Sequence, residues 1–291
     1  METVKKSLTY GELYRQLQSL LSPKMGVGES KAVIRIIFEY LKDWSPVDMI
    51  VNEPREVSAY IQRKCKEISG RLLCDEPIQY IVGEGLFYGL KLKVAPGVLI
   101  PRQETEELVD IIVRRNERVS DLRVLDICTG SGCIAIALAR NLLFPEVTGV
   151  DVSSEALGIA EENVRRMKVN VSLREEDIFH WEPQPGSSDI IVSNPPYIDE
   201  SEKSDMERVV LDNEPHIALF VPDDDPLCFY RRIILIARNA LSEYGQLYFE
   251  INPRHADELR RMVEESGFRN VDILRDSFGK YRFLIARKDG R

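Results

Sequence analysis

Apolar residues recur at helical spacing through the first part of the chain. Three sets repeat every three or four positions, which is the pattern of helices that bury one face. They are Leu13, Tyr14, Leu17, Leu20 and Leu21; Val33, Ile36, Ile37, Tyr40 and Leu41; and Val57, Ile61, Cys65, Ile68 and Leu72. This pattern predicts a small helical bundle that forms an N-terminal domain over residues 1–75.

Residues 76–103 have a different pattern, in which glycine and proline interrupt every helical repeat. These interrupting residues are Gly83, Gly85, Gly89, Pro96, Gly97 and Pro101. Between them, the alternation at 90–94 and the apolar run 98–100 predict short strands that form a hairpin. We therefore expect this segment to connect two domains.

From residue 104 to 291, strand and helix patterns alternate. Strands are expected at 123–127, 147–151, 188–193, 245–251, 270–274 and 281–286, and helices at 104–118, 133–142, 154–167, 227–241 and 256–266. This alternation is typical of an α/β domain in which helices cover both faces of a Rossmann-like, mostly parallel sheet. The short link between the last two strands predicts an antiparallel hairpin at one edge.

Composition and charge narrow the function classes. Of 291 residues, 39 are Lys or Arg and 48 are Asp or Glu, which gives a formal net charge of −9. Phosphate backbones repel such a chain on average, so we expect no stable binding to nucleic acid. No apolar run approaches the roughly 20 residues that span a bilayer, so no membrane association is expected. The five cysteines lack metal-site spacing, which predicts reduced thiols, a cytoplasmic protein and no bound metal.

A glycine-containing turn follows the first predicted strand of the sheet. In the segment Asp126-Ile127-Cys128-Thr129-Gly130-Ser131-Gly132, the two glycines let the backbone approach a ligand without an intervening Cβ. The turn lies where open α/β sheets bind ligands, beyond the carboxyl ends of their strands. Asp151 ends the next strand, where a carboxylate accepts hydrogen bonds from both hydroxyls of a ribose. These features predict a nucleotide-like cofactor.

Two cofactor classes fit this turn, and a glycine turn without any ligand is a third alternative. A dinucleotide site prefers glycine at the position of Ala135, although alanine is a permitted variant there. Asp126, in the strand before the turn, resembles instead the acidic first motif of class I methyltransferases. In those enzymes the turn meets a cationic methionine group rather than phosphates. We therefore expect S-adenosylmethionine as the cofactor.

A second motif, Asn194-Pro195-Pro196-Tyr197, follows the apolar strand at 188–193. Proline has no N–H, and a residue before proline is extended, so this loop is stiff and presents carbonyl oxygens. The side chain of Asn194 adds another acceptor. Such a loop suits a planar NH2 group, because acceptors for both hydrogens leave the nitrogen lone pair free to turn towards a methyl donor. Tyr197 would cover one face of that group.

The second motif alone leaves alternatives open. A Pro-Pro turn with an asparagine cap is common after strands and needs no ligand. The motif also does not distinguish an adenine amine from a glutamine amide, since both are planar NH2 groups.

The chain as a whole resembles the HemK/PrmC family of release factor glutamine methyltransferases. The resemblance covers nearly the whole length and is most specific in the connector. The residues that carry it are Pro77, Tyr80, Gly83, Phe87-Tyr88-Gly89-Leu90, Val94, Val98-Leu99-Ile100-Pro101-Arg102, Glu104-Thr105-Glu106, the turn from Asp126 to Gly132, Asp151-Val152-Ser153, Asn194-Pro195-Pro196-Tyr197-Ile198, Glu214-Pro215, Ala218-Leu219, Phe229-Tyr230-Arg231, Glu250-Ile251 and Asp276 to Arg282.

The resemblance implies a seven-stranded class I S-adenosylmethionine-dependent methyltransferase domain at 104–291. The implied reaction methylates the side-chain amide of the glutamine in the Gly-Gly-Gln motif of class I peptide chain release factors, in support of translation termination. The helical N-terminal domain would help to hold the factor.

The resemblance also implies roles for individual residues. The residues that would contact the cofactor are Cys128, Thr129, Gly130, Ser131, Gly132 and Asp151. Asn194 would meet both the cofactor and the substrate amide. The other substrate-side residues would be Pro195, Pro196, Tyr197 and Phe87, of which Phe87 and Tyr197 would line the pocket.

The sequence departs from the family pattern at several positions. Cys128 replaces a usual glycine, and Asn252 and His255 replace a usual glycine and glutamine. The segment 221–226 replaces a glycine-rich stretch. Ile178, which we expect on the adenine side of the cofactor, stands near a position where some members have tryptophan.

Two other functions remain as alternatives. Methylation of an adenine amine in DNA or RNA would use the same Asn-Pro-Pro-Tyr chemistry, but it predicts a basic groove or an added recognition domain, and the sequence indicates neither. The second alternative is a scaffold that binds the cofactor without catalysis. Such a protein would be expected to carry substitutions in the glycine turn, at Asp151 or at Asn194, and all of these are intact.

Overall fold

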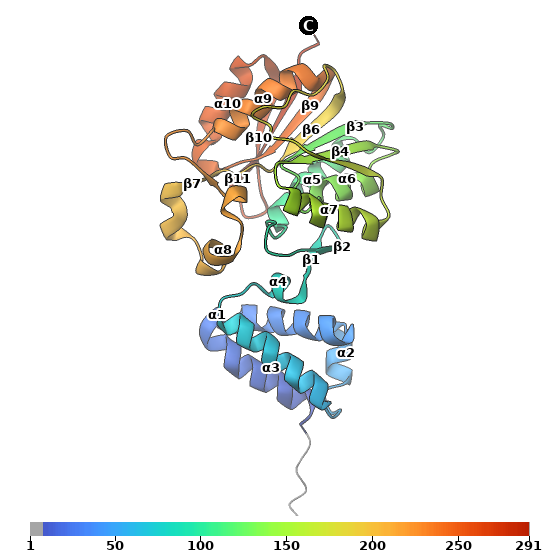
Figure 1. Cartoon of the computed structure of the whole chain (residues 1–291), viewed down its shortest axis with the longest axis vertical. Coiled ribbons are helices and arrows are strands. Elements are labelled where there is room, and N and C mark those ends of the chain that lie inside the picture. Colours follow the sequence, from blue (N-terminus) through green and yellow to red (C-terminus); the bar gives the residue numbers. More distant parts are fainter. Residues whose placement is uncertain (1–7, 291) are drawn as a thin grey trace, which may run out of the picture. The chain divides into compact units, whose positions relative to one another are not determined.

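The computed structural model describes residues 8–290 of the chain (Figure 1). These residues form two compact units. One unit contains residues 8–83 and the short segment Arg208–Asn213, and the other contains residues 84–207 and 214–290. The chain therefore passes from one unit to the other three times.

The first unit is a helical bundle, as the apolar repeats predict. Its helices are α1 (Tyr10–Lys42), α2 (Pro46–Val51), α3 (Ala59–Leu73), α4 (Ile78–Val82) and α8 (Arg208–Asn213). Gly26, with a φ of 81°, interrupts α1, so the first two predicted repeats lie on either side of a kink. Thr9 and Ser45 begin α1 and α2, because each hydroxyl accepts a hydrogen bond from a backbone N–H that the helix leaves unpaired. Most members of the three apolar sets meet in one core, whereas Leu20 and Tyr40 are exposed.

The second unit is built on a seven-stranded sheet with the order β10-β11-β9-β6-β3-β4-β5. Its strands are β3 (Arg123–Ile127), β4 (Glu146–Asp151), β5 (Val171–Glu175), β6 (Ser188–Ser193), β9 (Leu241–Glu250), β10 (Phe268–Arg275) and β11 (Tyr281–Lys288). Strands β9, β6, β3, β4 and β5 are parallel, while β11 is antiparallel to both of its neighbours. The predicted α/β fold and terminal hairpin are confirmed.

Helices cover both faces of the sheet, and each face has its own apolar core (Figure 1). The helices are α5 (Gln103–Arg115), α6 (Cys133–Asn141), α7 (Ser154–Met167), α9 (Cys228–Ala240) and α10 (Ala256–Glu265). Alternate strand residues separate the two cores: Leu125 packs towards α9 and α10, whereas Val124 packs towards α5 and α6. The antiparallel hairpin of β1 (Glu84–Phe87) and β2 (Leu90–Lys93) adds Phe87, Leu90 and Leu92 to the second core. The expectation that the run 98–100 forms a strand of this hairpin is wrong, because the partner of β2 lies before it in the chain.

The apolar pattern did not locate every element. Strand β5 lies at the edge of the sheet and has no fully buried residue, so its sequence lacks the apolar run of the central strands. The helix expected at 104–118 ends at Arg115, because Asn116 caps it. Short elements also join the larger ones: β7 (Ile198–Asp199) pairs with β8 (Phe220–Val221), and the 3-10 helices are η1 (Glu200–Asp205), η2 (His216–Ala218) and η3 (Pro253–His255).

The strand order creates a natural ligand site between β3 and β6. After β3 the chain adds β4 and β5 on one side, and it then returns to add β6 and β9 on the other. The loops that leave β3 and β6 therefore diverge at a topological switch point, where open α/β sheets bind ligands. Ile127 pairs with Ser193 in the sheet, so the next residues, Cys128 and Asn194, leave neighbouring strand ends.

Candidate active site

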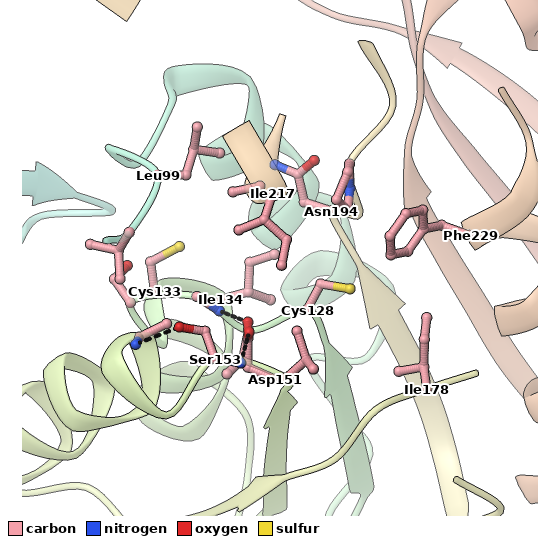
Figure 2. A pocket seen from close by; sticks show the side chains of 18 of the residues that line it. Leu99, Cys128, Cys133, Ile134, Asp151, Ser153, Ile178, Asn194, Ile217 and Phe229 are labelled. Carbon is pink, nitrogen blue, oxygen red and sulfur yellow. Dashed lines mark hydrogen bonds between the residues drawn. The ribbon is translucent and has the colours of Figure 1, made fainter. Parts of the chain in front are cut away.

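A cavity of about 280 Å³ lies at the carboxyl ends of the parallel strands of the second unit. This volume is near the lower end of the roughly 300–1,000 Å³ that small-molecule sites occupy. Its walls come from the loops after β3, β4, β5 and β6, together with segments 97–105 and 217–218 and the start of α9. Figure 2 shows Asp151 below the cavity, Asn194 above it, and Ile178 and Phe229 together at one side.

The glycine turn after β3 is held by two carboxyl groups, the fully buried Asp126 and the partly buried Asp151. Asp126 Oδ2 accepts hydrogen bonds from the Thr129 hydroxyl at 2.6 Å and from the Ala135 N–H at 3.1 Å. Asp126 Oδ1 is buried and has no hydrogen-bond partner among residues 8–290. Burial raises the pKa of Asp126 to about 7, and the bonds from Thr129 and Ala135 oppose this rise. Asp126 therefore anchors the turn through Oδ2, while its other oxygen stays buried without a hydrogen bond.

Cys128 begins this turn with a left-handed backbone, at a φ of 61°. Such a conformation is uncommon for a residue with a side chain and is natural for glycine. The Cys128 side chain packs partly against the core beneath α9 and α10. The turn thus retains a conformation suited to glycine although a cysteine occupies the position.

Asp151 presents a preorganised acceptor to the cavity. Its Oδ2 accepts from the N–H of Gly130 at 2.8 Å, and its Oδ1 accepts from the N–H of Ser153 at 3.0 Å. Each carboxylate oxygen has about two acceptor sites, so each keeps one for a ligand. Burial is the main cause that raises the pKa of Asp151, and the backbone hydrogen bonds oppose it. A pair of neighbouring hydroxyls, as in a ribose, matches the two remaining acceptor sites.

An apolar wall stands beside Asp151. Ile178 is buried and lines the cavity, and Phe179 and Phe229 line it with their rings 5.1 Å apart in an edge-to-face arrangement. Such a wall suits a flat aromatic base, because it removes apolar surface from water without requiring polar partners. Sequence reasoning predicted Ile178 but missed the two phenylalanines. Phe179 directly follows the predicted Ile178, which was an available signal, whereas Phe229 reaches the site only through the packing of α9.

Asn194 is the polar group on the opposite side of the cavity. It follows β6, whose last residue, Ser193, donates a hydrogen bond to the Ile127 carbonyl at 2.6 Å. The Nδ2 of Asn194 donates to the Thr105 hydroxyl at 3.2 Å. The loop after it is stiffened by Pro195 and Pro196, both of which are buried. This arrangement places a carboxamide where it can meet a second ligand beside the cofactor site.

A network of polar groups supports this loop, and one of them, Thr105, also lines the cavity. The Tyr197 hydroxyl donates to Glu250 Oε1 at 3.0 Å, and the Thr105 hydroxyl donates to Glu250 Oε2 at 2.6 Å. Tyr230 donates to the backbone carbonyl of Glu250 at 2.8 Å. Asn252 Nδ2 donates to the Tyr197 carbonyl at 3.0 Å, so asparagine at this position has a structural task. Sequence reasoning missed Thr105 as a site residue, because nothing in the local pattern links it to Asn194.

An ion pair between a buried carboxylate and a half-buried arginine joins two segments that cover the cavity. Arg102 Nη2 contacts Glu214 Oε1 at 2.5 Å, and Glu214 Oε2 accepts from the N–H of Ile100 at 3.1 Å. The side chain of Glu214 is 1% exposed. The pair fixes segment 97–102 against segment 214–218, so that Leu99 and Ile217 reach the same cavity (Figure 2).

The structure gathers most of the predicted site residues at this cavity. Those that line it are Cys128, Thr129, Gly130, Ser131, Asp151, Ile178, Asn194 and Pro196. Gly132 does not line it, but begins α6 with a φ of 79° and packs against Ala160. Pro195 and Tyr197 lie behind the cavity wall, and Phe87 is fully buried in the core. The predicted ligand contacts, both of these four residues and of the residues that line the cavity, stay predictions.

Neither a metal-ligand cluster nor a membrane-spanning helix occurs among residues 8–290. Between residues 8 and 290, no cluster of three or more His, Cys, Asp and Glu side chains is placed to hold a metal ion. None of the helices in that range is both long enough and apolar enough to cross a membrane.

Comparison with known proteins agrees with this architecture. The protein-family model of the PrmC N-terminal domain matches residues 12–83, and the family model of the methyltransferase small domain matches residues 103–216. Among solved structures, a methyltransferase from Pyrococcus furiosus shares the fold, with a TM-score of 0.50 and 19% identity over 77% of this chain and 99% of that one.

Curated relatives match nearly the whole chain. The release factor glutamine methyltransferase of Bacteroides thetaiotaomicron is 46% identical over 275 residues, which cover 94% of this chain and 97% of that protein. The enzyme of the same name from Flavobacterium psychrophilum is 40% identical over 259 residues, covering 88% and 91%. These matches include both the helical unit and the cavity, and they confirm the resemblance seen in the sequence. The chain belongs to the family of release factor glutamine methyltransferases.

Proposed function

We propose that this protein transfers a methyl group from S-adenosylmethionine to the side-chain amide nitrogen of a glutamine in a peptide chain release factor. The observation that carries the proposal is the Asn194 carboxamide, which lines the same cavity as Asp151 and the glycine turn. Membership in the family supplies the substrate class. The glutamine of the Gly-Gly-Gln motif in class I release factors is the expected target.

The residues at the cavity fit this cofactor. Asp151 would hold the ribose hydroxyls, the wall of Ile178, Phe179 and Phe229 would hold the adenine, and the turn 128–131 would face the methionine part. The bound cofactor supplies an already activated methyl group. The protein's remaining task is to bring a weak nucleophile into line with that group.

Asn194 and the loop after it would prepare the substrate nitrogen. The nitrogen lone pair of an amide is delocalised into the carbonyl group, so a planar glutamine amide is a poor nucleophile. The Asn194 Oδ1 and the Pro195 carbonyl would accept its two hydrogens, which raises electron density on nitrogen and turns the lone pair towards the methyl group. Pro196 and Tyr197 would keep the loop rigid, and Tyr197 does so through its bond to Glu250. A hydroxyl or thiol substrate, with one hydrogen, would use only half of this arrangement.

Charge favours a protein over a nucleic acid as substrate. The adenine amine is also a planar NH2 group, so the loop chemistry does not separate the two. With a net charge of −9, the chain would need a strong local basic face to hold a phosphate backbone. We expect no stable nucleic-acid binding, and a cytoplasmic location, where release factors act.

A competition between substrates tests the proposal. A class I release factor, its Gln→Ala variant at Gly-Gly-Gln, and unmethylated DNA and RNA are each incubated with the protein and labelled cofactor. Mass spectrometry is expected to place one methyl group on the glutamine and none on the variant. Label on nucleic acid, or equal label on both forms of the factor, would overturn the proposal.

A further inference from the structure

A chain of hydrogen bonds connects Asn194 to a buried carboxylate. Asn194 Nδ2 lies 3.2 Å from the Thr105 hydroxyl, which lies 2.6 Å from Glu250 Oε2. Thr105 and Glu250 are 3% and 1% exposed, so bulk water does not compete for the bond between them. The three residues come from α5, the loop after β6 and the end of β9, and only the fold brings them together.

The direction of each bond in this chain follows from chemistry. Burial raises the pKa of Glu250, whereas hydrogen bonds from Thr105 and Tyr197 and the positive charge of Arg282 favour its ionised form. Both of its oxygens act as acceptors, Oε2 for Thr105 and Oε1 for Tyr197. A carboxylate only accepts hydrogen bonds, so the single hydrogen of the Thr105 hydroxyl is directed at Glu250. Thr105 then offers Asn194 only a lone pair. The NH2 end of the Asn194 side chain is the end that can use a lone pair, and the carbonyl oxygen must therefore face the other way.

The orientation of this side chain matters because its two ends have opposite properties. A carboxamide fits the same space after a rotation of 180°, which exchanges an acceptor for a donor. With the oxygen towards the substrate, Asn194 accepts a hydrogen from an NH2 group. With the NH2 end towards the substrate, two donors would face each other.

We propose that Glu250, acting through Thr105, fixes the orientation of Asn194 so that its oxygen faces the substrate amide. Thr105 and Glu250 are thus positioning residues, and this role rests on the proposed function of Asn194 as the acceptor. Tyr197 strengthens the arrangement because its hydroxyl occupies the other oxygen of Glu250. The bond from Tyr230 to the Glu250 carbonyl holds the backbone at the same point.

Thr105→Val tests the inference, because valine has nearly the same shape as threonine but cannot accept a hydrogen bond. Turnover of the release factor is expected to fall about 5–30-fold, the loss that corresponds to one orienting hydrogen bond. Calorimetry should find the cofactor affinity within about threefold of wild type, since Thr105 bonds to Asn194 rather than to Asp151. Thr105→Ser keeps the hydroxyl and should retain turnover within about threefold.

Two further measurements separate orientation from general damage. In the Asn194→Ala background, Thr105→Val should cause no additional loss of turnover, because Thr105 acts through Asn194. Tyr248→Phe removes another buried hydroxyl of the same unit, whose bond to Gln246 lies away from the cavity, and should leave turnover unchanged. If the valine variant does not fold, Thr105→Ala removes the same acceptor in a smaller side chain.

The results distinguish this inference from the proposed function. If wild-type protein leaves the factor unmethylated, the proposed function fails whatever the variants do. If wild-type protein methylates glutamine and Thr105→Val turns over equally fast, the orienting role is wrong and the function stands. Equal losses in Thr105→Ser and Thr105→Val, or additive losses with Asn194→Ala, would also overturn the orienting role.

Discussion

The turn after β3 and the loop after β6 leave neighbouring strands, but they are stabilised in different ways. The turn depends on groups close to it in sequence: Thr129 and Ala135 bond to Asp126, which is 3 and 9 residues away, and Gly130 bonds to Asp151, which is 21 residues away. The loop depends on distant groups. Asn194 bonds to a residue 89 positions away, and Tyr197 bonds to residues 53 and 55 positions away.

The two halves of the site therefore have different origins. The locally held turn, which is the proposed cofactor half, is specified by residues close to it in the sequence. A loop held by distant side chains depends on the complete sheet and its helices. Changes in the turn should therefore alter cofactor affinity or stability, whereas changes in the loop should alter turnover.

The largest expected effect comes from Asn194→Ala. This variant removes the proposed acceptor, so turnover should fall about 10²–10³-fold, by analogy with the loss of one preorganised polar group at an active site. Cofactor affinity should stay close to that of wild type. Steady-state kinetics measures turnover, and calorimetry measures cofactor affinity. A loss of cofactor affinity as large as the loss of turnover would show that the turn and the loop do not have separate roles.

Asp126→Asn should change how stability depends on pH. The folded protein keeps a proton on Asp126 up to about pH 7, while the unfolded chain loses it near pH 4. Folding therefore becomes less favourable as pH rises between these values, and the asparagine variant lacks this penalty. We compare the free energy of unfolding of the variant with that of wild type at each pH. Between pH 5 and pH 8, this difference should shift by about 2–3 kcal/mol in favour of the variant.

Urea unfolding of the cofactor-free proteins at several pH values measures this difference. Asparagine can keep the bonds from Thr129 and Ala135 through its carbonyl oxygen. A difference in stability that stays constant with pH would mean that Asp126 ionises normally in the folded protein.

Asp151→Ala is expected to weaken cofactor binding about 10–100-fold, since it removes charge-assisted hydrogen bonds worth roughly 1.5–3 kcal/mol. Calorimetry measures this loss. The helix cap of α7 comes from Ser153, so Ser153→Ala is a matched control that should lower stability more than affinity. Unchanged affinity in Asp151→Ala would remove Asp151 from the cofactor site.

The smallest effect is expected for Cys128→Gly. Glycine relieves the left-handed backbone but loses the packing of the cysteine side chain and makes the unfolded chain more flexible. These contributions oppose each other, so the free energy of unfolding should stay within about 1 kcal/mol of wild type. Cys128→Val, which places a β-branched residue in the same conformation, should be clearly less stable. Equal stability of the two variants would argue against a left-handed conformation at this position.

The sequence predicted the parts of this molecule that depend on repeating or local patterns. The helical bundle, the alternation of strands and helices, the glycine turn and Asp151 all belong to this group. Strand β5 was not located because an edge strand needs no continuous apolar run. The supporting roles of Thr105 and Glu250, and the place of Phe229 in the cavity wall, depend on packing between elements far apart in the chain.

The assignment of Arg208–Asn213 to the helical unit has a consequence for any attempt to divide this protein. Asn213 donates a hydrogen bond to the Asp75 carbonyl, and Glu214, the next residue, belongs to the ion pair that covers the cavity. A truncation at residue 83 would therefore remove the partners of α8 while leaving α8 attached to the catalytic part. If the chain were cut at residue 83 and both fragments were kept, α8 in one fragment would still bind its partners in the other. No single position in the sequence therefore separates the residues of the two units.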